Sequence, residues 1–212
     1  MAADAKLDDA IAYLRAADPV LRGLIDRVGI DSLGDRRRGR PRDHYGALVR
    51  TIVGQQLSTK AARAIYGRLA ERFGGRAPTP EEILVDDPDE LRTAAGLSHA
   101  KVGYLRSLAE HVLDGSLELT KLGRLGDERV IAELVAVKGL GLWSAQMFLM
   151  FHLQREDVLP VGDLGIRRAI MVAYELPELP GPERMTAIAE PWRPQRTLAS
   201  LLLWRSLDLT PI

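Results

Sequence analysis

Apolar residues recur every three or four positions along most of the chain, the spacing that gathers side chains on one face of an α-helix. Residues 5–28 show this helical spacing, with an interruption at Pro19. Further helices are predicted in residues 43–73, which hold two, and in 80–85, 88–95, 98–113, 127–137, 142–153, 163–174, GPERMTAIAEPW and RPQRTLASLLLWRSL. Residues 116–122 alternate between polar and apolar side chains but stand alone. The pattern therefore predicts an all-α fold of about ten helices.

Residues that commonly begin or end a helix mark the boundaries between the predicted helices. Ser58 and Asp163 stand where a helix N-cap is expected, because their side-chain oxygens can accept main-chain N–H groups. The loops near the middle of the chain predict two helical lobes with a cleft. One lobe is expected to comprise about residues 43–125, and the other about residues 1–42 together with 126–212.

The segment VAVKGLGLWSAQMFLMF, residues 135–151, has Gly139 and Gly141 between two predicted helices. A glycine inside a helix costs about 1 kcal/mol relative to alanine, so the pair is expected to form a turn, giving a helix–hairpin–helix. The first N–H groups of the second helix lack helical acceptors and carry the positive end of the helix dipole, so they can bind an anion. We interpret both glycines as letting a DNA phosphate approach the main chain. Tight packing between the two helices is the alternative.

Composition excludes several kinds of site. The chain of 212 residues has no cysteine, which excludes disulfides, thiolate catalysis, zinc fingers and cysteine-ligated iron–sulfur clusters. The four histidines are scattered and match no metal-site spacing. Basic and acidic residues number 29 each, so nucleic-acid binding requires a local basic patch. No apolar run could cross a bilayer and MAADAKLDDA lacks a signal-peptide segment, so we expect a cytoplasmic protein, nucleoid-associated if bacterial, with no membrane partner.

Further stretches show which helix–hairpin–helix proteins this sequence is similar to. After the hairpin, VLPVGDLGIRRAI has a loop with glycine and proline, and then an aspartate that opens a helix. Three other stretches keep a matching order and spacing: LVRTIVGQQLSTKAA, GLSHAKVGYLRSLA and AEPWRPQRTLASLLLW. From about residue 40 to 206 the sequence resembles the helix–hairpin–helix/Gly-Pro-Asp superfamily of DNA glycosylases, and within it the 3-methyladenine DNA glycosylase II type.

This resemblance implies that Asp163 is the catalytic carboxylate. Breaking an N-glycosidic bond develops positive charge on the sugar, and a carboxylate beside it stabilises that charge and can orient or deprotonate the attacking water. Simple capping of the helix is the alternative role. Bifunctional members of the superfamily carry a nucleophilic lysine early in the second hairpin helix, where Trp143 stands here, and Lys138 precedes the turn. A monofunctional enzyme that uses water is therefore expected.

The resemblance also implies a pocket for a base extruded from the duplex. Trp143 and Trp204 match aromatic positions of the family's pocket, and Met147 and Gln55 are further candidates for its wall. An aromatic wall binds a cationic alkylated base by stacking and cation–π attraction. The alternative for the tryptophans and the methionine is a place in the hydrophobic core.

Extrusion leaves a gap in the duplex, and the resemblance implies that Gln56 or Leu57, in GQQLST, is the wedge that fills it. A core contact between helices is the alternative for Leu57. Basic side chains with a candidate role in binding DNA phosphates, alongside the hairpin glycines, are Lys60, Arg63 and Arg196. Solubility of the surface is the alternative role of these three side chains. No cofactor is required, but the family's hairpin can hold Na⁺ or K⁺ through main-chain carbonyls, here those of Val135, Val137 and Leu140.

The sequence therefore predicts a monomeric, monofunctional DNA glycosylase of base excision repair. Its expected substrate is double-stranded DNA with alkylated purines such as 3-methyladenine and 7-methylguanine. One alternative is a helix–hairpin–helix DNA-binding protein without catalysis, which would keep the hairpin glycines but would not need Asp163 or the tryptophans. The other is a glycosylase for mismatched or oxidised bases, which would call for more hydrogen-bonding residues in the pocket.

Overall fold

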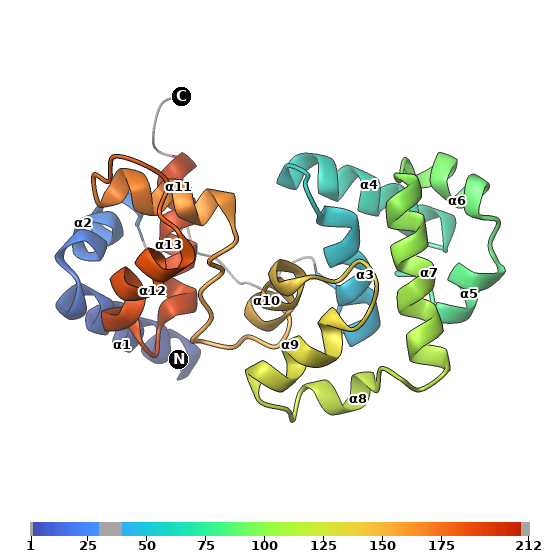
Figure 1. Ribbon diagram of the computed structural model, residues 1–212, viewed down its shortest axis with the longest axis horizontal. Helices are drawn as coiled ribbons and strands as arrows, with labels where there is room; N and C mark the ends of the chain where they lie inside the picture. The colour runs from blue at the N-terminus through green and yellow to red at the C-terminus, as the bar shows by residue number, and fades with distance from the viewer. Residues whose placement is uncertain (1, 30–39, 209–212) are drawn as a thin grey trace. The chain divides into compact units, whose positions relative to one another are not determined.

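The computed structural model describes residues 2–29 and 40–208, and within these ranges the chain consists of helices joined by turns and loops. Thirteen α-helices and one 3₁₀ helix occur there, and no strand does. In chain order they are α1 (Ala2–Ala17), α2 (Pro19–Val28), α3 (His44–Gly54), α4 (Thr59–Arg72), α5 (Pro80–Val85), α6 (Pro88–Ala95), α7 (His99–Leu113), α8 (Leu119–Leu122), α9 (Asp127–Val135), α10 (Leu142–Phe151), α11 (Leu164–Ala173), α12 (Pro182–Ala189), η2 (Glu190–Trp192) and α13 (Arg196–Asp208) (Figure 1). The predicted all-α class is confirmed.

The chain divides into two compact units. The terminal unit comprises Met1–Arg38 and Gln154–Ile212, and the middle unit comprises Gly39–Leu153. This division differs from the expected one, because residues 126–153 fall in the middle unit and not with the chain ends. The physical reason is packing: α9 and α10 contact each other, and α10 also packs on α3.

The terminal unit is built from both ends of the sequence. Helix α13 packs against α2 and α11, so the blue and red segments of Figure 1 share one core. That core contains Leu14, Leu21 and Leu24 from the N-terminal helices together with Leu202 and Leu203 from α13. Each side chain is at most 2% exposed, so burial of apolar surface holds the two distant segments together.

A buried carboxylate fastens this unit at the start of α2. Asp18, only 6% exposed, caps the helix by accepting the N–H groups of Val20 and Leu21. Its other oxygen accepts the Tyr174 hydroxyl at 2.5 Å and the Trp192 indole N–H at 2.9 Å. Burial, followed by this contact with Asp18, raises the pKa of Tyr174. Trp192 is fully buried and therefore belongs to the core.

Replacing Asp18 with alanine is expected to lower the free energy of unfolding by about 3 kcal/mol or more, because four buried or partly buried donors would lose their acceptor. Urea denaturation of the variant and the parent measures this difference. Asp26→Ala is the matched control, since the side chain of Asp26 is 59% exposed and pairs with Arg15 at the surface. A loss for Asp18→Ala no larger than that of the control would contradict this account.

The middle unit is organised around α3, which contacts α4, α7, α8 and α10. Its buried face includes Leu48, Ile52 and Val53, all 0% exposed. Several helices of this unit begin where capping residues predict. The Ser58 hydroxyl accepts the Ala61 N–H at the start of α4, as expected from the sequence. The single-turn helix α8 was not predicted.

Candidate functional site

Asp163 is held at the N-terminus of α11 by two hydrogen bonds to one carboxylate oxygen. Its Oδ1 accepts the main-chain N–H of Ile166 at 2.9 Å and the indole N–H of Trp204 at 2.9 Å. Trp204 comes from α13, which packs on α11. A Cβ at Gly165 would lie 3.0 Å from this oxygen and from the indole, so a glycine there leaves room for the tryptophan. Asp163 is thus a helix cap, as the sequence predicted, and its orientation is also fixed by Trp204.

The arrangement around Asp163 suits the stabilisation of positive charge. The N-terminus of a helix favours an anion, so the carboxylate occupies a favourable electrostatic position. Asp163 is only partly buried in the structure. An oriented, partly accessible carboxylate is a competent partner for a cationic reaction centre or for a water molecule.

The hairpin turn between α9 and α10 shows why residue 139 is glycine. Gly139 has φ +93°, a left-handed conformation that side chains disfavour. A Cβ at this position would lie 2.1 Å from Cγ of Tyr104 and 2.6 Å from its Cβ. Rotation of the tyrosine ring could not relieve such a clash. The fold itself therefore requires a glycine at residue 139, because Tyr104 lies against the turn, and the phosphate role of this glycine stays a prediction.

Gly141 has different surroundings. It is the N-cap of α10, with φ −97° and no side-chain cap. An added Cβ would meet no atom within 4 Å, and the residue is exposed. The fold therefore does not explain this glycine. Its openness fits the anion-binding role predicted for the hairpin, since the first N–H groups of α10 lack a side-chain acceptor.

The loop between α3 and α4, residues 55–58, is hereafter the wedge loop. Gln56 at its tip has φ +57°, and the side chain of Leu57 is exposed, so Leu57 is not a core contact between helices. The Gln55 amide donates to the main-chain oxygen of Gly139 at 2.7 Å and to Oγ of Ser144 at 2.9 Å. Both amide N–H donors of Gln55 are thus used by the hairpin. The role expected for Gln55 in the base pocket is corrected in one respect: neither N–H donor of its amide is available to a base.

Two residues of α7 support this region and were missed by the sequence reasoning. The Lys101 ammonium group donates to the main-chain oxygens of Val53 at 2.7 Å and Gln55 at 2.9 Å, and burial lowers its pKa. Tyr104 follows one helical turn later and packs on Gly139. Their spacing within GLSHAKVGYLRSLA indicates a shared helix face, but nothing local identifies what that face contacts.

The phosphate role expected for Arg196 is not supported. Its guanidinium pairs with the Asp157 carboxylate at 2.6 Å and also donates to the Asp157 main-chain oxygen at 3.0 Å. The side chain is only 13% exposed. Arg193 binds the same carboxylate at 2.9 Å. The charge of Arg196 therefore fastens the chain before α11 to the start of α13. Lys60 and Arg63, in contrast, are exposed on α4.

The remaining candidates belong to the hairpin and α10. Trp143 is half-buried in the first turn of α10, and Met147, one turn later, is 9% exposed. Of the carbonyls expected to hold a cation, that of Val137 already accepts the Leu140 N–H at 3.0 Å within the turn.

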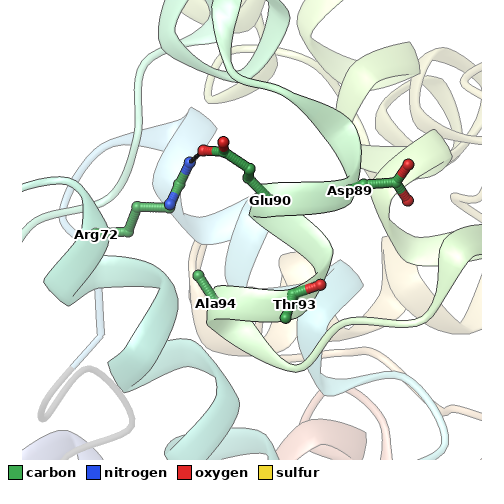
Figure 2. A pocket seen from close by; sticks show the side chains of 5 residues that line it. All are labelled: Arg72, Asp89, Glu90, Thr93 and Ala94. Atoms are coloured by element: carbon green, nitrogen blue, oxygen red, sulfur yellow. Dashed lines mark hydrogen bonds and ion pairs between the residues drawn. The ribbon is translucent and has the colours of Figure 1, made fainter.

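A shallow hollow of about 480 Å³ in the middle unit is not the predicted base pocket. Figure 2 shows the side chains that line it, which are Arg72, Asp89, Glu90, Thr93 and Ala94. Arg72 spans this hollow to pair with Glu90 at 3.1 Å, and it also pairs with Asp86 at 2.6 Å. None of the predicted site residues lines this hollow.

Comparison with known proteins assigns these features to a family. The sequence profile described as "HhH-GPD superfamily base excision DNA repair protein" matches residues 49–194, a range that contains the hairpin and Asp163. The chain belongs to the HhH-GPD superfamily. The family predicted from the hairpin and the segment around Asp163 is thereby confirmed.

Individual relatives of this HhH-GPD chain carry closely related names. DNA-3-methyladenine glycosylase 1 of Schizosaccharomyces pombe is 34% identical over 205 residues, covering 96% of this chain and 89% of that protein. DNA-3-methyladenine glycosylase 2 of Escherichia coli is 29% identical over 202 residues, covering 90% and 67%. The solved S. pombe 3-methyladenine DNA glycosylase (Mag1) in complex with abasic DNA has a TM-score of 0.84 and 34% identity, covering 95% of this chain and 98% of that one.

Among the helices that the structure describes for this HhH-GPD chain, none combines the length and apolarity that a bilayer span requires.

Proposed function

We propose that this chain is a monofunctional DNA glycosylase that releases alkylated purines, such as 3-methyladenine and 7-methylguanine, from double-stranded DNA. The observation that carries the proposal is the Asp163 carboxylate, oriented by the N-terminus of α11 and by Trp204 in a chain of the HhH-GPD superfamily. The S. pombe and E. coli relatives, both named DNA-3-methyladenine glycosylases, support the substrate class. We further propose that the protein acts as a monomer.

The chemistry follows from the charge that develops during the reaction. As the glycosidic bond lengthens, the sugar becomes cationic, and the fixed negative charge of Asp163 lowers the energy of that state. The same carboxylate can orient a water molecule or accept its proton as the water attacks the anomeric carbon. A purine alkylated at N3 or N7, as in 3-methyladenine and 7-methylguanine, is itself cationic in the DNA, so it leaves as a neutral base without needing a general acid.

Hydrolysis by water, rather than attack by a lysine, is supported by the hairpin. The position early in α10 that bifunctional relatives use for a lysine is occupied by Trp143. Lys138 lies on the other side of Gly139, and its side chain is exposed. No amine is therefore offered by the first turn of α10 for Schiff-base formation, which supports an intact abasic strand as the product.

The remaining roles are assigned as follows. Trp143 and Trp204 would provide aromatic faces for a cationic base, and Leu57 or Gln56 would fill the gap left in the duplex. The N–H groups that follow Gly141 would bind a phosphate. Lys60 and Arg63 would add phosphate contacts from α4, and the carbonyls of Val135, Val137 and Leu140 would hold a monovalent cation at the hairpin.

The proposal is tested by product analysis with duplex DNA that has been methylated at purines. We expect chromatography to show free 3-methyladenine and 7-methylguanine, and gel electrophoresis to show a DNA strand that breaks only after alkali treatment. Absence of free base would overturn the proposed activity. Strand cleavage without alkali would overturn the monofunctional mechanism alone.

A further inference from the structure

We infer that Lys101 is a positioning residue for base extrusion, because it fixes the wedge loop in the shape that presents Leu57 to the duplex. This inference rests on the proposed function. It concerns a residue of α7 that has no predicted role in the chemistry.

The contacts of Lys101 all converge on the end of α3. Its ammonium group donates to the main-chain oxygens of Val53 and Gln55, at 2.7 and 2.9 Å. Carbonyls at a helix C-terminus lack helical donors and carry the negative end of the dipole, so a cation there is favourable. No carboxylate pairs with Lys101 among the residues that the structure describes. The cost of partly burying this charge is therefore offset by main-chain groups of the wedge loop and of the helix before it.

The wedge loop needs such support because its backbone is strained. Gln56 has φ +57°, a left-handed conformation that residues other than glycine disfavour. The Gln55 carbonyl that Lys101 binds belongs to the peptide group immediately before Gln56. On the other side, the Ser58 hydroxyl caps α4. The main chain is thus held on both sides of Gln56 and Leu57. The side chain of Leu57, which is 37% exposed, therefore projects from a backbone of fixed conformation.

The same helix also connects this loop to the hairpin. The Gln55 side chain bonds to the Gly139 carbonyl and Ser144, and Tyr104, one turn after Lys101 on α7, packs on Gly139. Lys101 therefore supports an assembly in which the loop that replaces the base and the turn that binds the backbone are joined. Loosening Gln55 would misplace Leu57 relative to the bound phosphate, and a misplacement of 1 Å can cost about a hundredfold in rate.

The test compares excision from methylated duplex with excision from methylated single-stranded DNA, which has no stack to replace. Lys101→Met keeps an unbranched side chain, one atom shorter, but removes its charge and donors. We expect single-turnover release from duplex to fall by about tenfold or more, since two charge-assisted hydrogen bonds are lost. Release from single strands should change less than about twofold. Lys121→Met, at a lysine 63% exposed on α8, is the matched control and should behave as the parent.

A double-mutant cycle tests whether Lys101 affects base release through the side chain of Leu57. If Lys101 acts through the wedge, Lys101→Met should add little once Leu57→Ala has removed the side chain that it positions. Lys101→Arg, which keeps the positive charge, should retain activity on duplex DNA. If Lys101→Met does not fold, Lys101→Gln is used in its place in all assays. Equal losses on both substrates, no loss on duplex, or additivity with Leu57→Ala would overturn the inference. An inactive parent protein would instead overturn the proposed function.

Discussion

Asp163→Asn should lower the rate of base release by about two to four orders of magnitude, while affinity for abasic duplex DNA stays within about threefold. Asparagine is as good a helix cap as aspartate and can still accept the N–H groups of Ile166 and Trp204. The substitution therefore removes the negative charge and leaves the hydrogen bonds that hold the group. Single-turnover release of 7-methylguanine measures the rate, and fluorescence anisotropy measures the affinity.

Asp87→Asn is the matched control for this prediction. Asp87 also caps a helix, accepting the N–H groups of Asp89 and Glu90 at the start of α6, but it belongs to the middle unit. We expect this variant to release base at the parental rate. If Asp163→Asn released base equally fast, Asp163 would be only a helix cap, and the non-catalytic DNA-binding alternative would have to be reconsidered.

Gly139→Ala should lower the free energy of unfolding by about 3 kcal/mol or more, through a left-handed backbone and an overpacked turn. The added methyl group would lie 2.1 Å from Cγ of Tyr104, so the turn or α7 would have to move. Because Gln55 bonds to the Gly139 carbonyl, that movement would also reach the wedge loop. Chemical denaturation monitors the stability, and circular dichroism at low temperature reports whether the variant folds.

Gly141→Ala separates the two glycines of the turn. Its added methyl group meets nothing within 4 Å, so we expect a loss of stability of at most about 1 kcal/mol, the value of a weaker N-cap. The methyl group would nevertheless stand beside the N–H groups proposed to bind phosphate, so affinity for abasic duplex should fall. Similar loss of stability for both variants would contradict the distinction, and unchanged affinity for Gly141→Ala would contradict the phosphate role.

Local signals predicted most of the helical framework. The bounds of α5 and α6 match the expected 80–85 and 88–95, because each begins with a proline after a capping side chain. Asp163 and Ser58 cap helices as expected for the same local reason: the acceptor and the N–H that it receives are three residues apart. The helices predicted over 127–137 and 142–153 end earlier, at Val135 and Phe151.

The contacts that assemble the candidate site could not be predicted in this way. Gln55 and Gly139 are 84 residues apart, and Lys101 and Gln55 are 46 apart. Such pairs depend on how α3, α7 and α10 pack, which helical periodicity does not specify. Arg196 shows the same limit, since an arginine on the C-terminal helix was a candidate phosphate contact, whereas the structure places its guanidinium beside Asp157, 39 residues earlier.

Because the terminal unit combines both ends of the sequence, its core can form only after the last helix has been synthesised. On the ribosome, α1 and α2 are made before α13, whose Leu202 and Leu203 complete their core. At ordinary rates of elongation, roughly ten to forty seconds separate the two events. The middle unit consists of consecutive residues and can complete its own core during that interval. The nascent chain therefore exposes the apolar faces of α1 and α2 while it grows, and these are the segments that we expect molecular chaperones to bind during translation.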